Sequence, residues 1–221
     1  YIFSGNISRM GCDNFAEGER FATFPGGSIG WVASEESWLK NKNISLLKLR
    51  ASYGRAGQSI TGAGRYPYQG TYATGGGYNF GTNQSYTEGA YESKAGNLNN
   101  KWEISDMLNA GLDFDFWNKQ LYGSVDVFKE WRSNILVTRS TIPSLFGLSV
   151  PQDSYGKAES KGFEITIGHR NNIGKFNYYL EGMLSWNTNK ITEMDEVEPN
   201  VPWQRKTGKR IFDYFVADGV C

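Results

Sequence analysis

The stretch from Trp102 to Trp117, WEISDMLNAGLDFDFW, decides the fold. From Trp102 to Phe116 the even-numbered residues are apolar except for Asp106, and the residues between them are polar or glycine except for Met107. This period of two indicates a β-strand with one apolar face. The strand is much longer than the roughly five or six residues of an ordinary soluble sheet, and a strand tilted across a bilayer needs about 9–11 residues plus extensions. The stretch therefore predicts a strand of a membrane barrel.

Similar alternation predicts strands in six further segments. They are residues Tyr1–Arg9, Phe21–Ala33, Ile44–Ala56, Leu121–Val137, Lys161–Arg170 and Lys175–Ile191. Together with the first stretch they predict an all-β, antiparallel, up-and-down transmembrane sheet of about seven strands.

The connections between these segments alternate in length. Asn118-Lys119 and Asn171–Gly174 are tight hairpin turns. Ser34–Asn43 is intermediate, and Ser34 followed by two glutamates predicts the N-cap of a short helix. The other connections are long: Met10–Arg20, Gly57–Lys101 and Thr138–Ser160. Short turns at one end and long loops at the other are typical of outer-membrane barrels, whose long loops are extracellular.

Composition excludes several classes. The chain of 221 residues carries 23 basic and 23 acidic side chains, so its net charge gives no general attraction to nucleic acid. A mean hydropathy of −0.52 is compatible with a barrel, because the lumen-facing residues and loops are polar. Cys12 and Cys221 form no disulfide or metal pattern.

Seven strands at about 4.8 Å spacing cannot close into an even-numbered barrel. The chain also starts inside a strand-like run at Tyr1. We therefore expect residues 1–221 to be one partial barrel domain, a fragment of a larger barrel, unless the fold is of another kind.

Several short motifs resemble the SusC/RagA family of TonB-linked outer-membrane transporters. In chain order they are Phe24-Pro25-Gly26-Gly27-Ser28-Ile29-Gly30-Trp31, Ser34-Glu35-Glu36-Ser37, Leu47-Lys48-Leu49-Arg50-Ala51-Ser52-Tyr53-Gly54, Asn97-Leu98, Lys101-Trp102-Glu103, Asn109-Ala110-Gly111-Leu112-Asp113-Phe114, Lys161-Gly162-Phe163-Glu164 and Trp186-Asn187-Thr188-Asn189. They follow the family's order across nearly the whole chain. The first strand departs from the family's usual Arg-Asp-Gly turn, because it ends in Arg9-Met10-Gly11.

The resemblance implies a 22-stranded barrel with a plugged lumen, of which the plug, the TonB-contacting segment and the remaining strands are absent from this chain. It further implies a place in the outer membrane in contact with lipid, and a SusD-type surface lipoprotein as partner. The resemblance also implies energised import of an oligosaccharide or peptide through TonB. No cofactor, metal or nucleic acid is implied.

The long segment Gly57–Lys101 is the best candidate for ligand contact. Its aromatic residues, set among Gly, Ser, Thr and Asn, are Tyr66, Tyr68, Tyr72, Tyr78, Phe80, Tyr86 and Tyr91. Aromatic faces beside hydroxyl and amide groups are suited to stacking on sugar rings and to adaptable hydrogen bonding. The alternative is that these rings pack the loop onto itself and onto the barrel rim.

Other residues are assigned structural roles. An aromatic girdle at the membrane interfaces is expected from Trp102, Trp117, Trp131 and Trp186. A polar lumen lining is expected from Asp113, Asp115, Asp126, Glu164 and Glu181. A solvated acidic loop, in preference to a Ca²⁺ site, is expected from Glu193, Asp195, Glu196 and Glu198. Close approach or bending of the sheet is expected at Gly111, Gly123 and Gly182.

The sequence is compatible with three functions. The first is a fragment of a TonB-linked importer. The second is a secreted, soluble β-sheet module that binds carbohydrate or adheres to surfaces, in which a second sheet would cover the apolar face. The third is an enzyme, which is least favoured because no nucleophile and base occur together and His169 is the only histidine. No catalytic residue is predicted.

Overall fold

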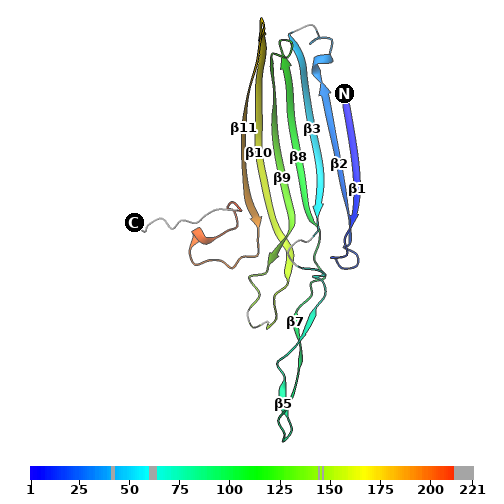
Figure 1. The fold of residues 1–221 in the computed structure, drawn as a ribbon, viewed down its shortest axis with the longest axis vertical. Coiled ribbons are helices and arrows are strands. Elements are labelled where there is room, and N and C mark those ends of the chain that lie inside the picture. The colour runs from blue at the N-terminus through cyan, green and yellow to red at the C-terminus, as the bar shows by residue number, and fades with distance from the viewer. Residues whose placement is uncertain (41–42, 60–63, 144, 146, 212–221) are drawn as a thin grey trace, which may run out of the picture.

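The computed structural model describes residues 1–40, 43–59, 64–143, 145 and 147–211, so Cys221 and part of the connection predicted to hold a short helix lie outside it. The described residues form a seven-stranded antiparallel sheet in the order β1-β2-β3-β8-β9-β10-β11 (Figure 1). The strands are β1 (Ile2–Gly11), β2 (Phe21–Val32), β3 (Ile44–Gln58), β8 (Glu103–Phe116), β9 (Leu121–Thr138), β10 (Gln152–Ile173) and β11 (Phe176–Glu193). Strands lie at all seven predicted segments, and the up-and-down order is confirmed.

Four short strands lie outside this sheet, in the connection between β3 and β8. There β4 (Thr71–Thr74) pairs with β7 (Ala90–Lys94), and β5 (Tyr78–Phe80) pairs with β6 (Ser85–Thr87). They form an arm that projects from the long-connection end of the sheet, away from the short turns (Figure 1). The described helices are two short 3-10 turns, η1 (Ala33–Glu35) and η3 (Pro202–Gln204). In the ranges that the structure covers, we find no helix with the length and apolar character needed to cross a membrane.

One face of the sheet is an apolar band, which we call the outward face. Strand register places Leu49, Leu112 and Val125 in one row across β3, β8 and β9, and Ile165 and Leu184 continue that row on β10 and β11. On β8 the band extends from Phe116 to Leu108, roughly 27 Å along the strand at the usual rise per residue. A tilt of about 40° reduces this to roughly 20 Å, close to the about 25 Å band of outer-membrane barrels.

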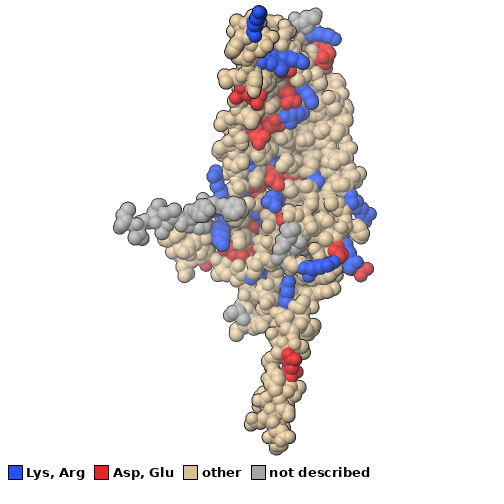
Figure 2. All heavy atoms as spheres, viewed as in Figure 1, with Lys and Arg blue, Asp and Glu red and all other residues tan. Residues whose placement is uncertain are grey.

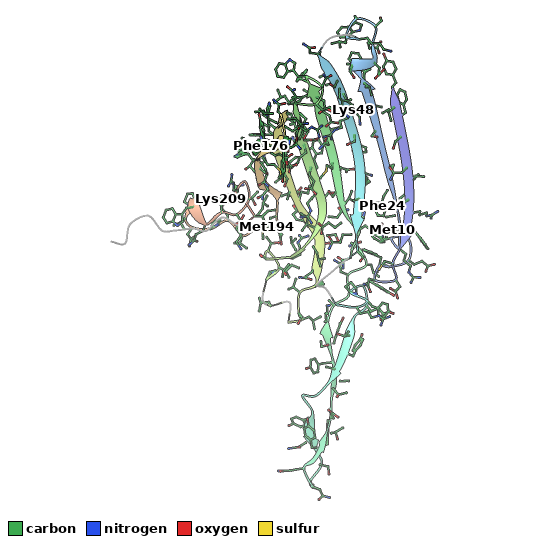
Figure 3. All side chains as sticks on the ribbon, turned by 45° about the horizontal axis from the view of Figure 1, so that its top comes forward. Met10, Phe24, Lys48, Phe176, Met194 and Lys209 are labelled. Carbon is green, nitrogen blue, oxygen red and sulfur yellow. The ribbon has the colours of Figure 1, made fainter. Side chains whose placement is uncertain are left out.

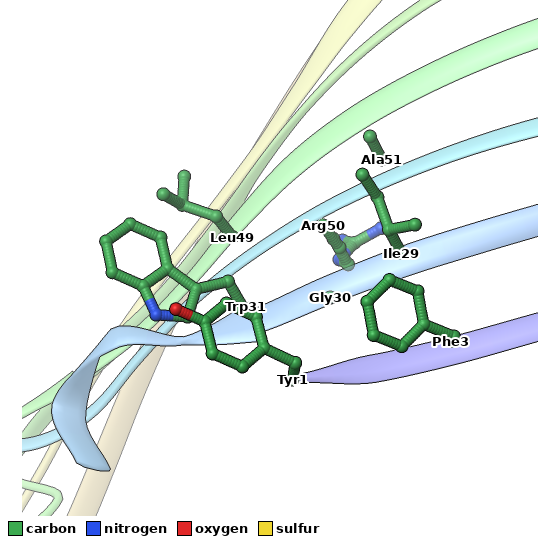
Figure 4. A pocket seen from close by; sticks show the side chains of 8 residues that line it. All are labelled: Tyr1, Phe3, Ile29, Gly30, Trp31, Leu49, Arg50 and Ala51. Atoms are coloured by element: carbon green, nitrogen blue, oxygen red, sulfur yellow. The ribbon is translucent and has the colours of Figure 1, made fainter. Parts of the chain in front are cut away.

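One hollow in the described surface belongs to this outward face. It has a volume of about 480 Å³ and is lined by side chains of β1, β2 and β3, including Phe3, Ile29 and Leu49 (Figure 4). The rings of Tyr1 and Trp31 stack at its edge, with centroids 6.5 Å apart. Because the lining side chains are almost all apolar, this hollow is part of the apolar outward face and offers few polar groups to a ligand.

A buried aromatic cluster closes the long-connection end of the sheet. Trp102 is 6% exposed and stacks on Phe15, which is fully buried, and Phe24 meets the same indole edge-on. Phe24 and Met10 mark this end of the sheet in Figure 3, whereas Lys48 and Phe176 mark the short-turn end. The prediction that Trp102 belongs to an interfacial girdle is therefore wrong, because the loop between β1 and β2 folds Phe15 over its indole. Trp117, Trp131 and Trp186 are 39–54% exposed, as a girdle requires.

Two local predictions also need correction. Strand β10 begins at Gln152, not near Lys161, so the connection predicted as Thr138–Ser160 is shorter than expected. Ser34 is not an N-cap: it lies inside η1, the N-cap is Val32, and no side chain caps this turn.

Aromatic rings lie directly over glycines of neighbouring strands. A Cβ atom on Gly168 would lie 2.2 Å from the Tyr122 ring, and one on Gly162 would lie 2.7 Å from the Phe128 ring. Phe114 covers Gly123 in the same way, at 2.7 Å. The expected close approach is thus found at Gly123 and, as described below, at Gly111, whereas no described atom lies within 4 Å of a Cβ on Gly182.

Candidate ligand-binding surface

The arm between β3 and β8 carries most of the aromatic residues predicted to contact ligand. Exposed fractions of 54–76% are found for Tyr72, Tyr78, Phe80, Tyr86 and Tyr91. The rings of Tyr78 and Phe80 lie on one face of β5 and meet edge-to-face at a centroid distance of 5.5 Å. These five rings lie on the projecting arm and not against the barrel rim, but contacts within the arm, such as that of Tyr78 with Phe80, are consistent with the part of the alternative in which the loop packs onto itself.

The backbone of the arm tip depends on glycine. Gly75, Gly76 and Gly81 have positive φ angles of 145°, 59° and 73°, which side chains rarely adopt. A Cβ on Gly77 would lie 2.1 Å from the carbonyl oxygen of Thr87 on the returning strand. The Tyr86 hydroxyl accepts a hydrogen bond from the Gly77 N–H at 3.2 Å, so this ring is held while its face stays exposed.

Tyr66 and Tyr68 lie at the base of the arm and are partly buried. The Tyr66 hydroxyl donates to Asp13 at 3.2 Å, and the two tyrosine rings meet edge-on at 6.2 Å. The Arg65 guanidinium lies 5.0 Å from the Tyr66 ring centroid. Tyr66 therefore attaches the base of the arm to the loop between β1 and β2, and Tyr68 packs against the Tyr66 ring, as the packing alternative expected.

Asparagines fix the other side of the arm's base. The Asn97 side-chain amide donates to the Gln152 carbonyl oxygen at 3.0 Å and to Asn100 at 3.2 Å, and Asn100 is 1% exposed. The Lys101 N–H donates to the Ser154 hydroxyl at 3.0 Å. The arm is thus tied to the start of β10. Asn97 stood in a family motif, but nothing in its spacing indicated the contact with β10, since Gln152 lies 55 residues further along the chain.

The arm has almost no charge. Between Thr71 and Tyr91 the only charged side chain is Glu88, and the arm is nearly all uncharged surface in Figure 2. Exposed aromatic faces among hydroxyl and amide groups are suited to uncharged, hydroxyl- or amide-rich ligands. The surface is not suited to a nucleic acid or another strongly anionic ligand.

The second chemical surface is the polar face of the main sheet, opposite the outward face. Arg50 of β3 pairs with Asp113 of β8 at 3.2 Å and with Asp126 of β9 at 2.6 Å. Its guanidinium reaches Asp126 across Gly111, whose Cβ would lie 2.6 Å from Arg50 Cζ. Arg50 therefore brings together two of the predicted lumen-lining carboxylates, Asp113 and Asp126. This role of Arg50 was not predicted from the sequence.

Nearer the short turns, the Tyr122 hydroxyl donates to Glu181 at 2.9 Å, and the Arg170 guanidinium lies 5.1 Å from the Tyr122 ring centroid. Strand register puts Asp115 and Glu164 on this same face. Acidic and basic side chains gather along the sheet in its short-turn half (Figure 2). We call this surface the polar wall.

The acidic segment after β11 folds back onto the connection between β9 and β10. Asp195 is 8% exposed, accepts hydrogen bonds from the Thr141 N–H and hydroxyl at 3.2 and 3.0 Å, and pairs with Arg139 at 3.1 Å. Burial raises the pKa of Asp195, but these donors outweigh it and hold the pKa below its usual value. The hydrogen bond from Arg139 to Asp153 at 3.1 Å is the main cause that raises the pKa of Arg139.

The prediction of a solvated acidic loop is therefore wrong for Asp195. Glu196 faces other donors, the N–H groups of Lys206 and Thr207 at 2.7 and 3.0 Å, and Glu193 pairs with Lys157 at 2.5 Å. The carboxylates are thus separated among different partners. Within the described residues, no group of three His, Cys, Asp or Glu side chains is placed to hold a metal ion.

The chain matches a known protein family. Residues 6–213 match the family described as "TonB dependent receptor-like, beta-barrel". The chain belongs to the TonB-dependent receptor β-barrel family. The match begins within β1 at Asn6 and includes the other six strands of the sheet, the arm and the segment after β11.

Curated relatives agree with this family. The chain is 32% identical over 199 residues to the TonB-dependent receptor P3 of Formosa agariphila, covering 89% of this chain and 19% of that protein. It is 31% identical over 227 residues to the TonB-dependent receptor SusC of Bacteroides thetaiotaomicron, covering 99% of this chain and 21% of that protein. The chain thus spans about a fifth of the length of these relatives.

Solved structures share the fold. The RagAB peptide importer in its closed-closed state superposes with a TM-score of 0.75 at 20% identity, covering 94% of this chain and 23% of that chain. The same importer in its open-open state gives a TM-score of 0.70 at 23% identity and covers 85% of this chain and 20% of that chain. The resemblance to the SusC/RagA group and the barrel fold are both confirmed.

Proposed function

We propose that residues 1–221 are one partial barrel domain of an outer-membrane transporter that imports oligosaccharides or peptides. The observation that carries this proposal is the two-sided sheet: an apolar outward face, a polar wall linked by Arg50 on the other face, and an aromatic arm at the long-connection end. Such a sheet suits lipid on one side and an aqueous, plugged lumen on the other. The proposal includes no covalent chemistry.

In this proposal the aromatic residues of the segment Gly57–Lys101 contact ligand or the partner that covers it. The five exposed rings of the arm make the contact, and Tyr66 and Tyr68 hold the arm in place. The uncharged arm favours a neutral glycan or a peptide backbone, both of which present hydroxyl or amide groups beside apolar faces.

The proposed partners are a SusD-type surface lipoprotein at the extracellular mouth and TonB, reached through parts of the receptor that this chain does not contain. Support comes from a relative named SusC and from the shared fold of a structure titled a peptide importer. Import would then consist of ligand capture under the lipoprotein, followed by plug rearrangement driven through TonB.

The soluble carbohydrate-binding module is less well supported. It requires a second sheet over the apolar face, and among the described residues the other two sheets are the two-stranded pairs of the arm. Leu108, Leu180 and Leu184 of the outward face are 48–74% exposed, which fits contact with lipid.

The experiment that tests the proposal uses the full-length receptor in its own cells. The double variant Tyr78→Ala/Phe80→Ala removes two exposed rings, and Thr82→Ala/Asn83→Ala at the same arm tip is the matched control. Depletion of an oligosaccharide mixture and of a peptide mixture from the medium is followed by mass spectrometry, with and without a protonophore.

We expect one of the two mixtures to be depleted, with loss of depletion when the protonophore is added. The aromatic variant should slow this depletion about tenfold, because each lost stacking contact is worth roughly 0.5–1.5 kcal/mol. The control variant should slow depletion much less, because it keeps both rings. Depletion that is insensitive to the protonophore would contradict transport through TonB, and equal rates in the two variants would contradict the role of the arm.

A further inference from the structure

Three lysines gather on the outward face where the apolar band ends. Lys129 of β9, Lys161 of β10 and Lys190 of β11 surround Glu159 of β10. Lys190 pairs with Glu159 at 2.8 Å, and Lys129 approaches the same carboxylate at 3.8 Å. We call these three residues the lysine cluster.

The charges of the lysine cluster are not balanced within the described chain. Lys129 and Lys161 are direct cross-strand partners, an arrangement that is unfavourable for like charges. Glu159 is shared by the other two lysines, and Lys161 makes no ion pair with any residue that the structure describes. By contrast, Arg55 and Asp106 on the same face form a balanced pair at 2.7 Å. The cluster therefore leaves a surplus of positive charge beside an apolar surface.

The position of the cluster is specific. Toward the short turns, the next outward residues are Val127 on β9 and Phe163 on β10, which belong to the apolar band. Toward the long connections, Trp131 follows on β9, and the Lys129 ammonium lies 5.0 Å from its ring centroid. The Tyr53 hydroxyl donates to Asp106 at 2.5 Å. The apolar band on β3 and β8 therefore gives way to polar groups at about the same level of the sheet as on β9 and β10. The lysine cluster thus lies at the edge of the apolar band that faces the long connections.

We propose that Lys129, Lys161 and Lys190 bind the phosphate group of an outer-leaflet lipid, whose acyl chains lie on the apolar band below. This inference rests on the proposed function, because it requires the long loops to face the cell exterior. Ammonium groups bind phosphate as compact point charges, and a phosphate supplies the negative charge that Glu159 alone does not. The adjoining Val127, Phe163 and Trp186 continue the same site into the region of acyl chains.

The test uses the purified full-length receptor in detergent, with diphosphoryl lipid A as the probe and its dephosphorylated form as the lipid control. The double variant Lys129→Gln/Lys161→Gln removes two charges at the boundary. Lys119→Gln/Lys175→Gln removes two charges at the short turns and is the matched control. Native mass spectrometry measures bound lipid, and heat-modifiable migration on gels verifies that each variant is folded.

We expect Lys129→Gln/Lys161→Gln to bind about thirtyfold less diphosphoryl lipid A, since each of the two lysines near a charged lipid surface contributes about 1 kcal/mol. The short-turn variant should bind as the unaltered receptor does. Equal binding by the two variants, or equal binding of the dephosphorylated lipid, would overturn the proposal. Failure of the proposed function would be seen differently, as unaltered receptor that does not fractionate with the outer membrane.

Discussion

Arg50 and Asp126 form an ion pair at 2.6 Å although their strands, β3 and β9, are not neighbours in the sheet. The strand between them, β8, contributes Gly111 at this level, and register aligns all three residues in one row. The absence of a side chain on Gly111 leaves the guanidinium a path across β8. A single arginine thereby links three strands of the polar wall.

Gly111→Ala should destabilise the receptor. The new Cβ would lie 2.6 Å from Arg50 Cζ and 2.8 Å from Asp126 Oδ1, so the ion pair must move. We expect a loss of about 1–3 kcal/mol in the free energy of unfolding, measured by urea titration of the full-length receptor in lipid vesicles. Gly54→Ala is the control, because no described atom lies within 4 Å of its Cβ. Equal effects at the two glycines would refute the steric argument.

Arg50→Met should leave two carboxylates of the polar wall without their cation. The side chains of Asp113 and Asp126 are only 27% and 14% exposed, so we expect a cost of roughly 2 kcal/mol in the same unfolding assay. Neutralising the acids as well, in Arg50→Met/Asp113→Asn/Asp126→Asn, should recover most of that loss. If the triple variant is less stable than Arg50→Met, the arginine contributes by packing and not by charge.

Trp102→Ala should be among the most destabilising substitutions in this chain. Its indole is buried between Phe15 and Phe24, and removal of such a ring costs roughly 3–5 kcal/mol. Trp203→Ala removes the same side chain from a site that is 57% exposed, and should change the free energy of unfolding by less than about 0.5 kcal/mol. A similarly small change in the free energy of unfolding in Trp102→Ala would contradict burial of the indole and support the predicted place of Trp102 in an interfacial girdle.

Acid should release the segment after β11 from the connection between β9 and β10. The pKa of Asp195 is lowered in the folded state, so its contribution to docking is fully present above the ordinary carboxyl pKa of about 4 and is lost as the pH falls through the lowered value. Hydrogen exchange of the Thr141 amide, which donates to Asp195, should accelerate relative to other amides over that range. In Asp195→Asn this amide should lose its extra protection at neutral pH. Protection of Thr141 that follows the same pH profile in both proteins would show that the carboxylate is not responsible.

The strands were predictable because burial on one face repeats every second residue, and β8 retains this pattern almost without interruption. The start of β10 was not predictable by the same rule. Its register shifts between Ser154 and Gly156 and again between Gly156 and Ala158, and each irregularity breaks the alternation that marks a strand. The start of β10 therefore lacks the alternation that is typical of a strand, although it pairs with β9.

The site was predictable only in part. The aromatic composition of the arm was evident, but exposure divides those residues into five that project and two that hold the base. The roles of Trp102, Arg50 and Arg139 depend on partners distant in the chain, such as Phe15, Asp126 and Asp195. No local pattern encodes such contacts, since they exist only once the strands have paired.

The rings that cover glycines have a consequence for assembly of the sheet. Tyr122 fits over Gly168 only in the native alignment, because a slip of two residues would place its ring against Thr166 or Arg170. Phe128 would likewise meet Ser160 or Glu164 in place of Gly162. Backbone hydrogen bonds would be satisfied equally well in the slipped pairings, so they cannot select the correct one. Each ring fits over its glycine only in the native register. Together these contacts favour the native register of a long, repetitive sheet over registers that are shifted by two residues.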